Sequence, residues 1–310
     1  MAHTPTSALN RLRSLILFAG LVASVARAQE TPGTGSWIDR LHLSATGTVS
    51  RVDNYSRTSY VPTRHDATTE DFSLSGSAPR QLAPSVLLIG SGELSSLAVT
   101  EYSLDNNFTA TGRITLQKKF GLGPQAWVLQ GSLGEGYKAA RLEADRGWTT
   151  EAGVQLAKRV LPNLRFAGSA RWLDHDAASA TFDLNQYSFG LEAQWDIDEH
   201  WTLSGSATRL KGDVVANAAW YVWEQAITGG FGPAVYNYYT SRPWSVTNLY
   251  GDGWVSYNVA ADVDLWSVSL AYAWSDHTSL ELRKGAAYVV NRVGIAYPSS
   301  SWGLSLIHRF

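Results

Sequence analysis

Large apolar residues alternate with small or polar residues along most of the chain. In residues 108–118 phenylalanine, alanine, glycine, isoleucine and leucine alternate with threonine, arginine and glutamine. The same period of two recurs in later segments, among them 147–158, 186–196 and 264–275. A period of two places successive side chains on opposite faces of a β-strand. The pattern therefore predicts an all-β protein.

The alternating segments and the turns between them predict about twelve strands. Each has about ten residues, the length that crosses a bilayer when the strand is tilted. Compact connections alternate with longer ones, and the longest covers about 212–263. Fourteen strands is the alternative, because the region after Lys211 has room for another pair. The predicted strands are 41–51, 70–78, 85–95, 107–118, 125–136, 147–158, 164–174, 186–196, 201–211, 264–275, 278–287 and 301–310.

Aromatic residues decide between two kinds of β protein. The strands of a water-soluble β-sandwich also alternate, but here the apolar faces repeatedly begin or end in an aromatic residue. The chain has 13 Trp and 14 Tyr in 310 residues. These side chains settle at membrane interfaces, and polar opposite faces suit a wet lumen. We therefore predict a transmembrane antiparallel up-and-down β-barrel over residues 41–310.

The N-terminal region has the features of a secretory signal peptide. Arg11 and Arg13 precede the apolar run "SLILFAGLVASV", and "ARA" at 26–28 matches a cleavage site. We predict that residues 1–28 are removed and that 29–40 form a periplasmic segment. The chain has no Cys and a formal net charge of −2, so disulfides are excluded and nucleic acid is not an expected partner.

The last ten residues, "SWGLSLIHRF", resemble the C-terminal strand signature of Gram-negative, porin-like outer-membrane β-barrels. The resemblance implies an outer-membrane location with both termini in the periplasm. It also implies outer-membrane lipid and lipopolysaccharide as surroundings, and a terminal strand that the barrel-assembly machinery reads. The residues that carry this signature share one strand face: Trp302, Leu304, Leu306, His308 and Phe310.

Charged residues on the polar faces are candidates for a pore constriction. Facing charges can select solutes by sign, but the same residues can also form a salt-bridged core that fills the barrel. Cross-strand pairs are expected between the arginines at 165 and 171 and the glutamates at 151 and 192. By strand parity the inward charges are Arg113, Glu151, Arg165, Arg171, Glu192 and Glu281.

The segment 212–263 is rich in aromatic residues and predicted to be an outer loop. Flat aromatic faces suit the stacking of sugar rings. Alternatively, the strands extend above the membrane, or the loop folds over the mouth on its own aromatic core. The aromatic candidates are Trp220, Trp223, Tyr238, Tyr239, Trp244 and Trp254.

These features favour a narrow passive channel for small polar solutes. The alternative is a non-conducting surface protein that binds a glycan or a partner through the aromatic loop. A lipid hydrolase or protease comes third, since His175 and His277 both have acidic neighbours but are predicted at opposite ends of the barrel. We predict no catalytic residues, no cofactor and no metal site.

Overall fold

The structure, a computed structural model, describes residues 41–310. The predicted signal peptide (1–28) and the segment 29–40 lie outside the described residues. Twelve long strands, each antiparallel to its neighbours, form a ring that closes through β1–β13 pairing. They are β1 (His42–Asp53), β2 (Ala67–Ala83), β3 (Val86–Val99), β4 (Asn107–Phe120), β5 (Trp127–Ala140), β6 (Gly147–Leu161), β7 (Leu164–Ala177), β8 (Leu184–Asp196), β9 (Trp201–Ala219), β11 (Trp254–Ala273), β12 (Thr278–Asn291) and β13 (Ala296–Arg309).

The predicted transmembrane barrel of twelve strands is confirmed, and the alternative of fourteen is wrong. The region after Lys211 adds only the short strand β10 (Trp244–Val246), which pairs with the edge of β11. Most strands are a few residues longer than predicted, because they continue pairing past the last apolar position.

The connection between β9 and β11 differs from the predicted 212–263 loop. The two strands pair with each other up to Ala219 and Trp254, so residues 212–219 and 254–263 are strand. This pairing satisfies the backbone hydrogen-bond donors and acceptors of the two strands where they extend past the rest of the barrel. The remaining segment, 220–253, holds β10 and two helices, α2 (Trp220–Ile227) and α3 (Pro233–Thr240).

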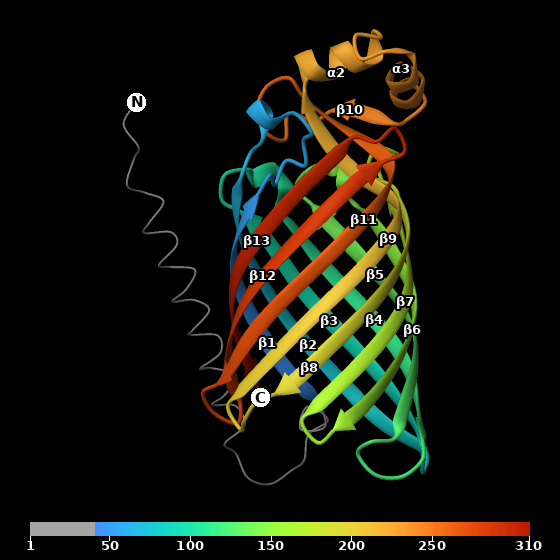
Figure 1. Ribbon diagram of the computed structural model, residues 1–310, viewed down its shortest axis with the longest axis vertical. Coiled ribbons are helices and arrows are strands. Elements are labelled where there is room, and N and C mark those ends of the chain that lie inside the picture. The colour runs from blue at the N-terminus through green and yellow to red at the C-terminus, as the bar shows by residue number, and fades with distance from the viewer. Residues whose placement is uncertain (1–40) are drawn as a thin grey trace.

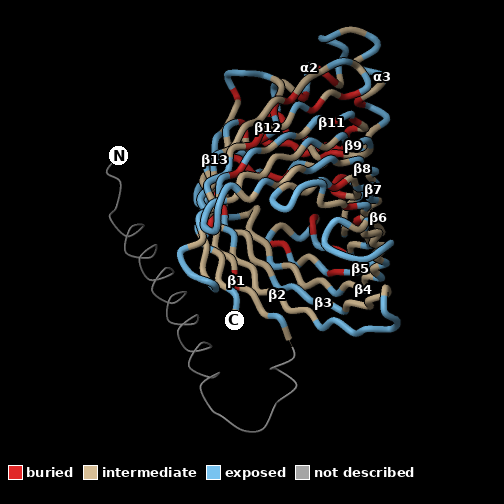
Figure 2. The backbone as a smooth tube through the Cα atoms, turned by 60° about the horizontal axis from the view of Figure 1, so that its bottom comes forward, coloured by how far each residue is buried: buried red, intermediate tan, exposed pale blue. Residues whose placement is uncertain are grey.

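The two ends of the barrel are unlike each other (Figure 1). One end, which we call the loop end, carries α2, α3 and three single-turn helices: η2 (Val61–Thr63), η3 (Ser103–Asp105) and η4 (Glu143–Asp145). The other end, which we call the turn end, carries short turns and the C-terminus. Figure 2 colours buried residues red. The largest buried side chains include Trp223 on α2 and Tyr297 near the start of β13, both at the loop end.

The outer wall is an apolar band between two rings of exposed aromatic residues. Strand register places one ring toward the loop end and the other toward the turn end, with side chains such as Leu133 and Leu191 between them. This is the surface of a barrel that faces lipid. The loop-end ring contains Phe108, Tyr137, Trp148, Tyr187, Trp266, Tyr288 and Trp302, and the turn-end ring Phe120, Trp127, Phe166, Trp195, Trp201, Tyr272 and Trp274.

None of the helices within residues 41–310 is both long enough and apolar enough to cross a membrane.

Gly147, the first residue of β6, is required where β6 meets β7. A Cβ at this position would lie 2.0 Å from the carbonyl oxygen of Asp176 and 2.8 Å from the Cα of Ala177. We therefore expect Gly147→Ala to cost about 1–3 kcal/mol, the usual penalty of overpacking. The measurement is the temperature at which the refolded barrel loses its heat-modifiable mobility in detergent gels.

Gly131 provides the matched control for Gly147, because a Cβ there would meet no heavy atom within 4 Å. Gly131→Ala should leave the transition temperature unchanged. Equal behaviour of the two variants would show that the close approach of β6 and β7 does not limit stability.

Candidate functional site

The inner wall of the barrel is lined by small polar side chains. Hydroxyl pairs bridge neighbouring strands, with Oγ–Oγ distances of 2.8 Å for Ser44–Ser75 and 2.8 Å for Ser206–Ser267. Gln130 donates to Gln117 at 2.8 Å in the same way. A wall of hydroxyl and amide groups is wetted readily, so the lumen can hold water and polar solutes.

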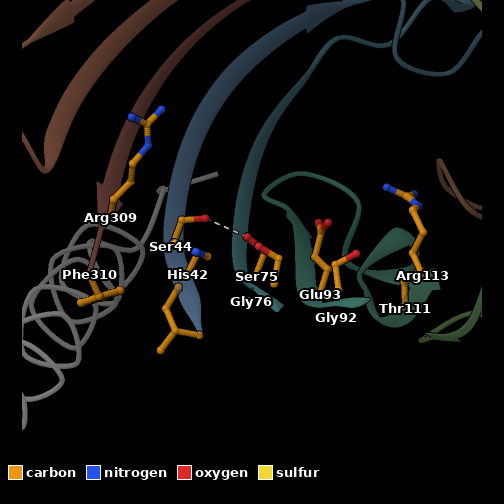
Figure 3. Close-up of a pocket in the computed structure, with 13 residues that line it drawn as sticks. His42, Ser44, Ser75, Gly76, Gly92, Glu93, Thr111, Arg113, Arg309 and Phe310 are labelled. Atoms are coloured by element: carbon orange, nitrogen blue, oxygen red, sulfur yellow. Dashed lines mark hydrogen bonds between the residues drawn. The ribbon is translucent and has the colours of Figure 1, made fainter. Parts of the chain in front are cut away.

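A cavity of about 410 Å³ lies inside the turn-end half of the barrel (Figure 3). Its wall comes from β1 to β4 and from the last residues of the chain. Both signs of charge are present on this wall, together with serine hydroxyls. The polar lining includes His42, Ser44, Ser75, Glu93, Arg113 and Arg309.

Arg113 and Glu151 form an ion pair across an intervening strand. Arg113 on β4 lies opposite Gly134 on β5, which in turn lies opposite Glu151 on β6. The Arg113 Nε donates to Glu151 Oε1 at 2.9 Å. A Cβ on Gly134 would lie 2.9 Å from the same oxygen, so glycine leaves the room that the pair occupies.

The predicted pairs of Arg165 and Arg171 with glutamates do not form, and that expectation is wrong. Register puts Arg171 opposite Gly153 and Ser188, while Glu151 is taken by Arg113. Arg165 likewise lies opposite Arg159 and Gln194.

Three of the six predicted inward charges, Arg113, Glu151 and Glu281, are therefore paired, and three are not. Glu281 pairs with Arg283 on the same strand, at 2.8 Å. Within residues 41–310, Arg165, Arg171 and Glu192 have no ion-pair partner. Arg171 and Glu192 are exposed although their strand parity points them inward. Water therefore reaches these charges from the lumen.

Sequence reasoning missed several inward charges. Glu93 and Arg309 lie on the polar faces of their strands and line the cavity in the turn-end half. Both residues follow the alternation of their strands, so strand parity was the signal that could have found them. Lys138 and His175 also face inward, but their roles depend on loop residues that parity cannot place.

Side chains from opposite sides of the barrel meet over the loop-end mouth. Tyr250, which precedes β11, lies with its ring centroid 4.8 Å from Tyr102 and 6.4 Å from Tyr55. Tyr102 belongs to the β3–β4 connection, which stands across the ring of twelve strands from β11. Leu104 from the same connection and Leu142 from the β5–β6 connection pack against this cluster. The loops thus span the mouth and narrow any path through it.

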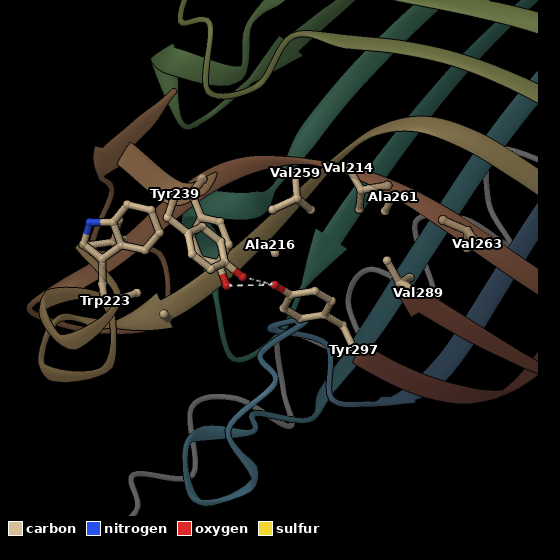
Figure 4. Packing of buried hydrophobic residues seen from close by; sticks show 13 residues of the cluster. Val214, Ala216, Trp223, Tyr239, Val259, Ala261, Val263, Val289 and Tyr297 are labelled. Carbon is tan, nitrogen blue, oxygen red and sulfur yellow. Dashed lines mark hydrogen bonds between the residues drawn. The ribbon is translucent and has the colours of Figure 1, made fainter. Parts of the chain in front are cut away.

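The segment 220–253 packs through Trp223, Ala226 and Tyr239 on buried side chains of β9, β11, β12 and β13 (Figure 4). Trp223 stacks on Tyr257 at 4.6 Å, and the hydroxyls of Tyr239 and Tyr297 lie 2.8 Å apart. Burial raises the pKa of Tyr239 to about 12, so its phenol stays protonated. Of the predicted aromatic candidates, Trp223, Tyr239 and Trp254 are buried and Tyr238 is partly buried, whereas Trp220 and Trp244 are 40% and 39% exposed.

Buried ionisable groups lie just beneath the loops. Tyr55 donates to Asp105 at 2.5 Å, and Lys138 contacts Asp145 at 2.6 Å. Burial raises the pKa of Asp105, and the hydrogen bond from Tyr55 partly opposes this rise. The first contact joins the β1–β2 connection to the β3–β4 connection, and the second joins the β5–β6 connection to the inner wall at β5.

His175 lies inside the barrel between Thr149 and Asp145. Thr149 Oγ1 is 2.9 Å from His175 Nδ1, while Asp145 Oδ1 is 3.6 Å from Nε2, beyond hydrogen-bond reach. The histidine side chain is only 4% exposed, so a substrate could not reach it without rearrangement. His277 lies in the β11–β12 turn at the other end, as predicted.

Among the residues that the structure describes, no group of three or more His, Asp or Glu side chains is arranged to hold a metal ion.

Solved structures share this fold, although no protein-family model and no curated protein matches the chain. An outer-membrane channel from Pseudomonas putida F1 has 9% identity and a TM-score of 0.58, over 91% of this chain and 100% of that one. The NanC porin has 10% identity and a TM-score of 0.43, over 86% of this chain and 100% of that one. The KdgM porin has 8% identity and a TM-score of 0.41, over 86% of this chain and 99% of that one. The first likeness establishes the fold of an outer-membrane β-barrel. All three proteins are named as channels or porins.

Proposed function

We propose that the protein is a narrow passive channel for small polar solutes in the outer membrane of a Gram-negative bacterium. The observation that carries this proposal is the exposure of Arg171 and Glu192 inside a closed barrel. A barrel filled by a salt-bridged core would bury and pair these charges. Solutes would diffuse along the hydroxyl-lined wall and past charges of both signs.

The proposed orientation puts the loop end outside the cell and the turn end, with the C-terminus, in the periplasm. Outer-membrane barrels have short periplasmic turns and long outer loops. The terminal strand supports an outer-membrane location, because Trp302, Leu304 and Leu306 are exposed on the outer wall. Lipid, lipopolysaccharide and the barrel-assembly machinery would contact them there. His308 and Phe310 continue the same face.

Conductance in a planar bilayer tests the channel directly. We expect the refolded protein to give steps of fixed size, and a salt gradient to give a reversal potential that reports the sign of the dominant lumen charge. A folded, heat-modifiable barrel that never conducts would exclude the channel.

Surface binding is the second candidate, favoured by the exposure of Trp220 and Trp244. Their ring centroids lie 6.2 Å apart at the loop end, where a glycan or partner protein could reach them. A binder of this kind would keep its ligand after changes to the lumen charges and lose it when Trp220 and Trp244 are replaced by serine.

A further inference from the structure

A second cavity, of about 320 Å³, lies beneath the loops at the opposite end from the first. Its size is at the lower end of the range for small-molecule sites, roughly 300–1,000 Å³. One part of the wall is apolar, with Phe182, Leu184 and Leu249, and another carries the charged residues Arg57, Asp105, Lys138 and Asp145. Such a wall suits a small molecule with an apolar body and a polar group.

The loop that carries Arg57 is held rigidly. Asn54 binds Thr58 twice, through Nδ2 to the carbonyl oxygen and through Oδ1 from the amide, each at 3.1 Å. Asn217 on β9 donates to the carbonyl oxygen of Ser56 at 2.8 Å. Ser56 and Thr58 are buried on either side of Arg57. The position of Arg57 in the cavity wall is thus fixed by contacts to its neighbours.

The backbone at Arg57 adopts an unusual conformation. Its φ is 48°, and that of Asn54 is 50°, in the left-handed region that most residues avoid. Such strain persists only where the surrounding structure enforces it, and it is concentrated at functional sites. An arginine held in this way, at the wall of a cavity, is a candidate for ligand recognition.

The other charges of this cavity already have partners. Lys138 is paired with Asp145 at 2.6 Å, and Asp105 accepts the hydrogen bond of Tyr55 at 2.5 Å. The Arg57 side chain has no ion-pair or hydrogen-bond partner within residues 41–310. It lies near enough to Tyr55, Tyr250 and Asp105 to oppose the rise in their pKa values that burial causes. Its five donors therefore remain available at the cavity wall.

We infer that this cavity binds a small organic monocarboxylate, with the carboxylate on Arg57 and the apolar body against Phe182, Leu184 and Leu249. A guanidinium offers two parallel N–H donors that match the two oxygens of a carboxylate. The inference rests on the proposed function, because it places the site on the solute path beneath the loops. A small monocarboxylate would then bind in this cavity on its way through the channel.

Calorimetric titration of the refolded protein in detergent with sodium benzoate tests this site. Benzoate should bind, and benzamide, of the same shape but without charge, should bind at least tenfold more weakly. Arg57→Asn should also weaken benzoate binding at least tenfold, since asparagine tolerates the left-handed backbone. Arg57→Lys should retain part of the affinity, because it keeps the charge but loses the paired donors.

Arg141 is the matched control, an exposed arginine of the same end that does not line the cavity. Arg141→Asn should bind benzoate as the unaltered protein does. Failure of the unaltered protein to bind benzoate, or equal binding by Arg57→Asn, would overturn the site. Because binding is measured without a bilayer, a conducting protein that does not bind benzoate refutes only the site, and a binding protein that does not conduct refutes only the channel.

Discussion

Replacing residues 220–253 by Asn-Gly is expected to raise the single-channel conductance at least twofold. Ala219 and Trp254 are partners in the β9–β11 ladder, so a two-residue hairpin turn can join them. The deletion removes Leu249 and Tyr250, which meet side chains from the opposite side of the mouth. A wider mouth carries more current, and single-channel recordings measure the difference.

The matched control is the double change of Trp220 and Trp244 to serine. Both side chains belong to the deleted segment and are exposed, and their ring contacts among the described residues are with each other and with Trp223 rather than with Tyr250. Conductance should then stay at the value of the unaltered channel. If the deletion leaves conductance unchanged while the barrel remains folded, the narrowest point lies deeper in the lumen and the loops do not control the path.

The barrel could be predicted from the sequence because its determinants are local. Alternation along each strand fixes which side chains face lipid, and the turns fix the order of the strands. The twelve-strand ring and the outward face that begins at Trp302 follow from these two features. Even the third predicted strand, where "VLLIG" alternates poorly, is present as β3 (Val86–Val99).

The arrangement over the mouth could not be predicted in the same way, because it depends on contacts between distant segments. The Tyr250–Tyr102 contact joins two connections that are far apart in sequence and on opposite sides of the ring. Parity identified Arg113 and Glu151 as inward residues, but their pairing depends on the space above Gly134. Arg57 could not be identified from the alternation of apolar and polar residues, since it lies in a loop whose shape is set by Asn54.

Reversing the charge of Arg171 is expected to change the ion selectivity of the channel. Two unit charges 4 Å apart interact by about 1 kcal/mol in water, so replacing a positive by a negative charge changes the relative permeability of cations and anions several-fold. Arg171 is exposed in the lumen without an ion-pair partner among residues 41–310. Arg171→Glu should therefore shift the reversal potential toward the value of a cation-selective pore, and Glu192→Gln should shift it the other way.

Arg209 is the control for Arg171, since it is an arginine of the barrel wall on the outer face. It pairs with Asp264 at 2.9 Å and with Asp262 at 3.5 Å, and it lies opposite the outward-facing Phe189. Arg209→Gln should leave the reversal potential unchanged. If Arg171→Glu and Arg209→Gln had the same effect, the ions would not pass Arg171. A selectivity change confined to Arg171 and Glu192 would place the ion path along the inner faces of β7 and β8, past charges that the fold leaves unpaired and in water.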